Sequence, residues 1–135
     1  MTKERNINID YDDDPETSAA IKEDEQGSDQ TTEVRRLNDD VRRHGRGGRV
    51  VLTRGVAALG PMVITVIMGA IRTFNGFTPG NDPYGEHDCA MVEVAGQSIL
   101  WKIDYFDTAL AGHSPDPADP EVTCRVLTVM LADEY

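Results

Sequence analysis

Residues 81–107 read NDPYGEHDCAMVEVAGQSILWKIDYFD and decide the fold, because they predict a β-hairpin. Apolar and polar residues alternate over residues 89–94 and again over residues 98–106, and alternation with a period of two is typical of strands. A two-residue turn at Gly96-Gln97 would place Val94 opposite Ile99 and Val92 opposite Trp101. The core-facing side of the hairpin would then carry Ala90, Val92, Val94, Ile99, Trp101, Ile103 and Tyr105.

A helix and a strand are predicted ahead of the hairpin. Residues 33–44 show an apolar stripe at helical spacing, formed by Val34, Leu37 and Val41. Thr31 and Thr32 are the predicted N-caps of this helix. RVVLTR at residues 49–54 then predicts a strand, because β-branched residues favour the extended conformation.

The run after Gly60-Pro61 predicts a second, strongly apolar helix, with proline at the first helical position. One face would carry Val63, Ile67, Ala70, Ile71 and Phe74. The other faces are apolar too, so we expect the helix to be deeply buried or covered by a partner. Because residues 63–67 are all β-branched, a strand stays open as an alternative for residues 62–71. Gly60-Pro61 interrupts the uncharged stretch, which argues against a membrane span.

Asp119-Pro120-Glu121 predicts the start of a last helix, with Asp119 as its N-cap. The buried stripe of that helix would be Val122, Val126, Val129 and Met130. The predicted order is therefore α-β-α-β-β-α. Such an order indicates one small α+β domain over residues 31–135, in which helices pack on an antiparallel sheet that contains the hairpin.

Residues 1–30 predict a disordered acidic tail. They hold ten acidic and three basic residues and few large apolar side chains. Such a segment cannot bury enough apolar surface to offset the entropy lost on ordering. The whole chain has a formal net charge of −11, which argues against direct binding to nucleic acid.

Residues 31–54 reverse this charge, with seven arginines against three acidic residues. The arginines are Arg35, Arg36, Arg42, Arg43, Arg46, Arg49 and Arg54. One interpretation is a solvated helix face. The alternative is a docking site for an acidic partner, which could be the protein's own tail.

Cys89 and Cys124 do not form a C-x-x-C motif, and the first residues of the sequence include no apolar leader. We therefore expect a cytoplasmic protein with reduced thiols. No cofactor is expected, because the sequence has no phosphate-cradling glycine loop, nucleophile elbow or dinucleotide fingerprint.

Several blocks of the sequence resemble the bacterial domain of unknown function 3768 family. They are GRVVLTRGVAAL, FNGFTPGNDPYGEHD, WKIDYFD and SPDPADPEVTCRVLTVMLADEY, and the resemblance runs from about Glu33 to Tyr135. It implies a compact cytoplasmic module, often carried on plasmids and other mobile elements, and no established activity. The acidic extension before residue 31 and the strongly apolar helix after Pro61 depart from the family's usual pattern.

Carboxylates and an imidazole are predicted to converge at the open end of the hairpin. The predicted pairing places Cys89 opposite Asp104 and Asp88 opposite Tyr105, and it puts His87 on the same face as Asp104 if the strand extends back to residue 87. Such a group could hold a divalent metal or act as an acid–base pair. No metal-binding spacing such as H-E-x-x-H is present, so no metal site is predicted.

The binding candidates of this region are Asp82, Glu86, His87, Asp88, Trp101, Asp104 and Asp107. The competing interpretation assigns His87 and Asp88 to hydrogen bonds that order the loop, and Trp101 to the core. In the following loop, His113, Asp116 and Asp119 are interpreted in the same way, as loop-stiffening residues and a helix cap.

The first functional hypothesis is a small acidic, non-enzymatic protein-binding module. On a mobile element it would suit an inhibitor of host defence, of anti-CRISPR or anti-restriction type, because an acidic surface can compete for a groove that binds phosphates. Its partner would then be a protein, such as a nucleic-acid-binding protein. The alternatives are a metal-assisted hydrolase using His87, Asp88 and Asp104, or a self-associating module that dimerises through the helix after Pro61.

Overall fold

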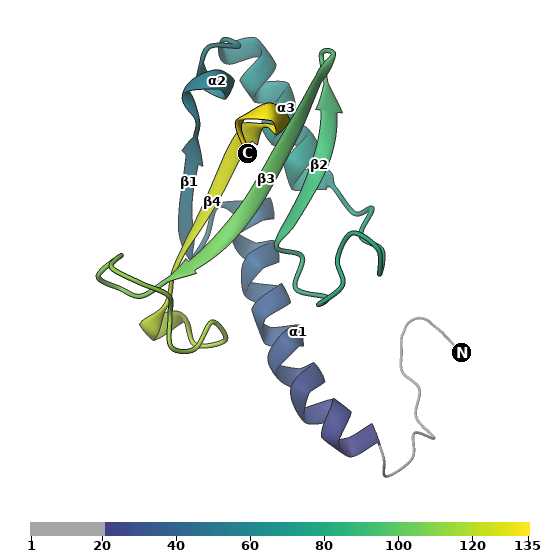
Figure 1. Ribbon diagram of the computed structural model, residues 1–135, viewed down its shortest axis with the longest axis vertical. Helices are drawn as coiled ribbons and strands as arrows, with labels where there is room; N and C mark the ends of the chain where they lie inside the picture. Colours follow the sequence, from purple (N-terminus) through teal and green to yellow (C-terminus); the bar gives the residue numbers. More distant parts are fainter. Residues whose placement is uncertain (1–20) are drawn as a thin grey trace. The chain divides into compact units, whose positions relative to one another are not determined.

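The computed structural model describes residues 21–135 (Figure 1). The chain divides into two units, residues 1–30 and residues 31–135, and the sheet belongs to the second. The elements are α1 (Ile21–His44), β1 (Gly48–Leu52), α2 (Arg54–Ala57), α3 (Pro61–Thr73), β2 (Cys89–Val94), β3 (Gln97–Phe106) and β4 (Cys124–Leu131). Single 3-10 turns lie at Pro120–Val122, before β4, and at Ala132–Glu134, after it. The predicted α+β class is confirmed.

Helix α1 begins at Ile21, so the predicted start at Glu33 was wrong, and Thr31 and Thr32 lie inside the helix instead of capping it. The residues before Glu33 form no apolar stripe, but glutamate, lysine and glutamine favour a helix by intrinsic propensity alone. The disorder predicted for residues 1–30 falls partly on residues 1–20, which lie outside the described residues. Residues 21–30 form the first part of α1.

The sheet has the strand order β1-β4-β3-β2, with β1 parallel to β4 and the other pairs antiparallel. Strand β4, one of the two inner strands, occupies residues for which the sequence predicted the last helix, so that prediction was wrong. Arg125, Leu127 and Val129 all face the helices and are buried, which is a strand period of two. The sequence did not reveal this strand because Arg125 interrupts the apolar pattern, and arginine is rarely buried without partners.

The hairpin is confirmed, but its turn consists of Ala95 and Gly96, and Val94 pairs with Gln97. Both turn residues have positive φ, 53° and 77°, the conformation that two-residue hairpin turns with matching twist require. The predicted register was therefore wrong by two residues, and Val92 pairs with Ile99. A shift of two keeps every side chain on its predicted face. Ala90, Val94, Ile99, Trp101 and Ile103 are accordingly buried.

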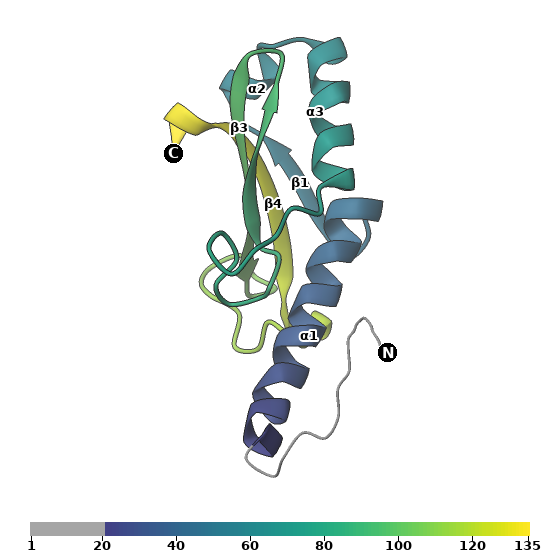
Figure 2. The same ribbon diagram turned by 90° about the vertical axis from the view of Figure 1, so that its right-hand side faces the viewer.

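Helix α3 and the C-terminal part of α1 cover one face of the sheet (Figure 2). The run after Pro61 is a helix, which settles the alternative of a strand, and its predicted inner face is confirmed by the buried Ile67 and Ile71. They pack with the fully buried Val56, Ile99, Trp101, Leu127 and Val129. In the described part of the chain, no helix covers the opposite face of the sheet. Nor is any helix of that part long and apolar enough to cross a membrane.

Candidate functional site

The segment between α3 and β2 is a loop folded on itself by short hydrogen bonds. The Asn81 side chain accepts from the Thr78 N–H at 2.8 Å and donates to the Gly76 carbonyl at 3.0 Å. The Asp82 N–H donates to the Thr78 carbonyl at 2.8 Å. Residues 81–88, NDPYGEHD, are called the signature loop below. These bonds fix the conformation of its first half without any contact to a helix.

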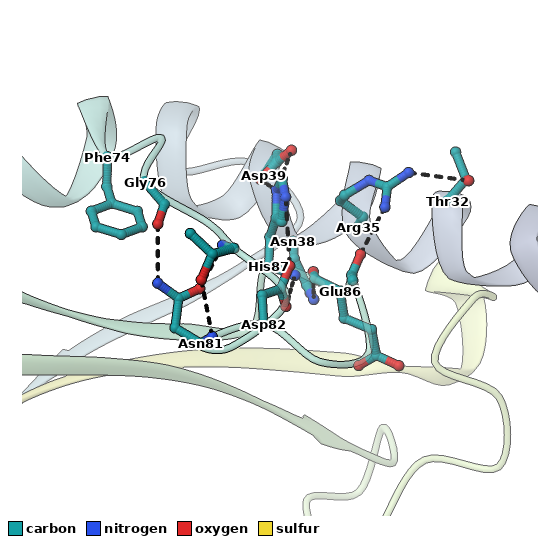
Figure 3. A network of polar contacts seen from close by, with 12 residues as sticks. Thr32, Arg35, Asn38, Asp39, Phe74, Gly76, Asn81, Asp82, Glu86 and His87 are labelled. Atoms are coloured by element: carbon teal, nitrogen blue, oxygen red, sulfur yellow. Dashed lines mark hydrogen bonds and ion pairs between the residues drawn. The ribbon is translucent and has the colours of Figure 1, made fainter. Parts of the chain in front are cut away.

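Helix α1 holds the second half of the signature loop through three residues on one of its faces, Arg35, Asn38 and Asp39 (Figure 3). Arg35 donates to the Gly85 carbonyl at 2.8 Å, and Asn38 donates to the Glu86 carbonyl at 3.0 Å. Asp39 contacts the His87 ring. The three bonds tie consecutive loop residues to the helix, so the loop has one position on α1.

His87 lies between two carboxylates. Its Nδ1 is 3.0 Å from Asp39 Oδ1 and its Nε2 is 3.7 Å from Asp82 Oδ2, while its ring stacks on Phe77 with centroids 3.8 Å apart. Burial raises the pKa of Asp39, but hydrogen bonds from His87 and Arg42 outweigh it and hold this pKa below its ordinary value. Because its two ring nitrogens face Asp39 of α1 and Asp82 of the loop, His87 bridges the loop and the helix.

A second set of hydrogen bonds centres on Asn38, which is fully buried. Its Nδ2 donates to the Tyr105 hydroxyl at 2.8 Å, and its Oδ1 accepts from Arg125 Nε at 2.8 Å. Tyr105 in turn donates to Glu86 Oε1 at 2.7 Å. Burial raises the pKa of Tyr105 well above its ordinary value, and the bond to Glu86 raises it further. The network joins α1, the loop, β3 and β4.

Arg42 is 2% exposed and caps the C-terminal end of α3. Its Nη1 donates to the carbonyls of Ile71 at 2.8 Å and Phe74 at 3.0 Å, and its Nη2 donates to Asp39 at 2.8 Å. Carbonyls at a helix end lack partners within the helix, and a cation there also interacts favourably with the helix dipole. The interpretation of the arginines as a solvated helix face was therefore wrong for Arg42.

The open end of the hairpin holds acids, but not the predicted cluster. Asp104 points to the uncovered face and pairs with Lys102, whereas His87 contacts Asp39 on the helix side. The alternative in which the strand extends back to residue 87, so that His87 shares a face with Asp104, was wrong, because strand β2 begins at Cys89 and His87 has a φ of 55°, outside strand geometry. Within the described residues, no three His, Cys, Asp or Glu side chains form a group that could hold a metal ion.

Two clefts flank these acids on the uncovered face. One of about 350 Å³ is lined by Asp88, Asp104, Tyr105, Phe106 and His113. The other, of about 290 Å³, includes Asp88, Cys89, Lys102 and Tyr135. Burial raises the pKa of Asp88, and the neighbouring carboxylates of Glu86, Asp82 and Asp104 raise it further. Asp88 and Asp104 line both clefts, so each cleft contains two carboxylates.

The remaining predicted residues have structural roles. Trp101 is fully buried in the core, so its place among the binding candidates was wrong. Asp107 accepts a hydrogen bond from the Ala111 N–H at 2.9 Å and orders its own loop. Asp119 accepts from the Glu121 N–H at 2.9 Å, which confirms it as a cap, although the helix is a single 3-10 turn.

Sequence reasoning missed the residues that anchor the loop, namely Arg35, Asn38, Asp39, Arg42, Tyr105 and Arg125. One signal was available for those on α1. Arg35, Asn38, Asp39 and Arg42 recur at spacings of three and four, which places them on one helical face beside Val34 and Val41. A polar stripe next to an apolar one is the pattern expected of a helix that packs on polar loop groups.

One family of known proteins matches the sequence. Residues 52–134 match the family described as "Protein of unknown function (DUF3768)", which is more than half of the chain. No curated protein and no solved structure matches the chain. The match includes the signature loop, the hairpin and β4, although it begins after the α1 residues that hold the loop. The chain therefore belongs to the DUF3768 family of proteins of unknown function.

Proposed function

We propose that this protein is a non-enzymatic protein-binding module, and that the clefts around Asp88 receive basic side chains of its partner. The observation that carries the proposal is the acidic cleft of about 350 Å³ on the sheet face that no described helix covers. Polar residues of the signature loop, in contrast, are engaged in internal hydrogen bonds. The surface available for recognition is thus the uncovered face.

The electrostatics of Asp88 favour a cationic ligand. Burial and three neighbouring carboxylates disfavour its negative charge, as the raised pKa shows. A guanidinium or ammonium group entering the cleft would relieve this cost, and partly desolvated charge pairs are stronger than exposed ones. Arginine-rich surfaces are typical of proteins that bind nucleic acid.

A partner with such a surface is consistent with a cytoplasmic inhibitor of a host defence system, of anti-CRISPR or anti-restriction type, encoded on a mobile element. The acidic module would occupy a groove that otherwise binds phosphates. The formal net charge of −11 would also speed association with a basic protein at low salt.

The test is a calorimetric titration with an arginine-rich peptide, comparing the wild type with Asp88→Asn. Glu93→Gln is the matched control, because it removes one charge from an exposed position on the same hairpin. We expect Asp88→Asn to weaken binding roughly tenfold and Glu93→Gln to weaken it less than threefold, since only the first removes a partly desolvated contact. Equal losses in both variants would reduce the interaction to net charge and contradict the cleft.

A second candidate is self-association through α3, and its outer face supports it. Met62 and Val66 are 83% and 58% exposed. Thr65 and Thr73 share this face, and their hydroxyls donate to the carbonyls of Pro61 and Gly69 at 2.9 and 2.8 Å. The exposed stripe therefore carries little free hydrogen-bonding capacity, and Arg72, two turns after Thr65, is the charged residue at its border.

Sedimentation of the full chain distinguishes this candidate. A dimer that becomes a monomer on Val66→Glu, but not on Glu93→Gln, would support contact through α3. A monomer at millimolar concentration would exclude it.

A further inference from the structure

We propose that β1 is a docking edge for an extended acidic peptide of a partner, which adds to the sheet as a fifth strand. This inference is independent of the function proposed for the Asp88 clefts, because it uses another edge of the sheet and a partner segment of opposite charge.

The backbone of β1 is open along one side. In the strand order β1-β4-β3-β2, β1 is an edge, and Figure 1 shows no described element beyond it. The Thr53 N–H donates to the Val129 carbonyl at 3.0 Å, so this residue faces β4. Because successive residues direct their N–H and C=O groups to opposite sides of a strand, those of Val50 and Leu52 face away from the sheet. A peptide strand would find its hydrogen-bond partners there.

The side chains of β1 are apolar on both faces of this edge. Val50 and Val51 are 43% and 44% exposed, and they lie in register with Leu127 and Thr128 of β4. Natural edge strands usually carry lysine, proline or a bulge that prevents further pairing. Between Gly48 and Leu52, β1 has none of these, and its only charged residue is Arg49.

Charge selects an acidic peptide. Arg49 lies within the strand and Arg54 just beyond its end, and both are exposed. Arg46 precedes the strand and pairs with Asp40 at 2.9 Å. Glu134, an acid beside the end of the strand, already accepts hydrogen bonds from the Thr53 hydroxyl and the Gly55 N–H at 2.6 and 3.0 Å. The edge is thus a basic site in a chain whose formal net charge is −11.

The same charges disfavour a second copy of this chain as the occupant. An antiparallel pair of β1 strands centred on Val50 would place the two Arg49 side chains diagonally on one face. Diagonal neighbours are roughly 7–8 Å apart, within reach of long side chains, so the like charges would repel. An acidic strand instead places a carboxylate opposite each arginine.

The test is an NMR titration of the full-length protein with a synthetic peptide, Glu-Val-Asp-Val-Glu-Val-Asp, capped at both ends. We expect the largest amide shifts at Val50 and Leu52, because their N–H groups gain partners. The matched basic peptide, Lys-Val-Arg-Val-Lys-Val-Arg, should bind at least about tenfold more weakly, as expected when charge pairs of this kind become repulsive. No binding of the acidic peptide at millimolar concentration, or shifts confined to other strands, would overturn the proposal.

Two variants separate charge from backbone pairing. Arg49→Glu should weaken the acidic peptide roughly tenfold, whereas Arg72→Glu, an equal charge reversal on α3, should change its affinity less than threefold. Val50→Pro removes an N–H that the sheet does not use, and proline is tolerated at such edge positions. It should therefore keep a cooperative thermal transition yet lose most of the affinity. Wild-type affinity in both Arg49→Glu and a folded Val50→Pro would rule out pairing at β1.

Discussion

On the helix-covered face of the sheet, Arg42 and Arg125 are each 2% exposed. Arg42 donates to the Ile71 carbonyl of α3, and Arg125 donates to Asn38 Oδ1 and to the Pro117 carbonyl. On the uncovered face, Lys102 pairs with Asp104 of the same strand, and Asp88 faces two clefts. The charged side chains on the covered face thus form hydrogen bonds inside the protein. We therefore expect substitutions there to lower stability, and substitutions on the uncovered face to alter binding while leaving the fold intact.

The largest expected effect is that of Arg42→Ala. It would remove the side-chain donor to the last carbonyls of α3 and one of the two partners of Asp39 Oδ1. Removing one member of a buried charged pair typically costs about 3–5 kcal/mol. The free energy of unfolding from urea titration measures this loss. The adjacent Arg43→Ala is the control, because Arg43 is exposed, and it should stay within about 0.5 kcal/mol of the wild type. Comparable losses in both variants would contradict a capping role for Arg42.

A smaller loss is expected for Asn38→Ala, at about 2–3 kcal/mol, because Arg125 Nε, the Tyr105 hydroxyl and the Glu86 carbonyl would each lose a buried partner. Asp40→Ala on the exposed side of α1 removes a surface ion pair, which solvent screens, and should therefore cost much less than Asn38→Ala. A double-mutant cycle of Asn38→Ala with Tyr105→Phe should show coupling, since the two side chains share a hydrogen bond. Strict additivity would exclude a connected network.

The two faces also differ in how far the sequence predicted them. Strand parity placed Trp101 and Ile103 toward the core and Asp104 away from it, because parity survives a register error of two residues. The Ala95-Gly96 turn was missed because its left-handed backbone is unusual for alanine. Strand β4 was missed because valine spacing fits both a helix and a strand, and the buried Arg125 obscured the period of two.

The candidate site was less predictable than the fold. His87 and Asp88 were identified as polar residues of one loop, but the partner that ties His87 to α1 is Asp39, 48 residues away in sequence. No local pattern encodes a contact over such a separation. The prediction that His87 and Asp88 order the loop applies to His87, while Asp88 belongs to the clefts.

Acid should weaken the covered face through Asp39. Its pKa is lowered in the folded state, because the hydrogen bonds from His87 and Arg42 outweigh burial. A carboxyl with a lowered folded pKa stabilises the protein above its unfolded pKa, and this contribution is lost as the pH falls through the folded value. Stability of the wild type should therefore decline below about pH 4, where an unperturbed aspartate begins to protonate. Asp39→Asn should be less stable at pH 7 and decline less steeply in acid, and parallel curves would contradict the linkage.

The smallest effect, and the one of opposite sign, is expected on the uncovered face at Asp88. Burial raises its pKa, with a further contribution from Glu86, Asp82 and Asp104, so the folded state binds this proton more readily than the unfolded chain. The charged form thus lowers stability at neutral pH, and the penalty disappears as the pH falls through the raised pKa. Asp88→Asn should raise the melting temperature slightly at pH 7 and leave it unchanged at acidic pH, whereas Glu93→Gln should have little effect at either pH.

Stabilisation by Asp88→Asn together with weaker binding of an arginine-rich peptide would show that this carboxylate contributes to recognition and lowers the stability of the fold. A loss of stability at pH 7 would instead place Asp88 with the internally partnered groups of the covered face.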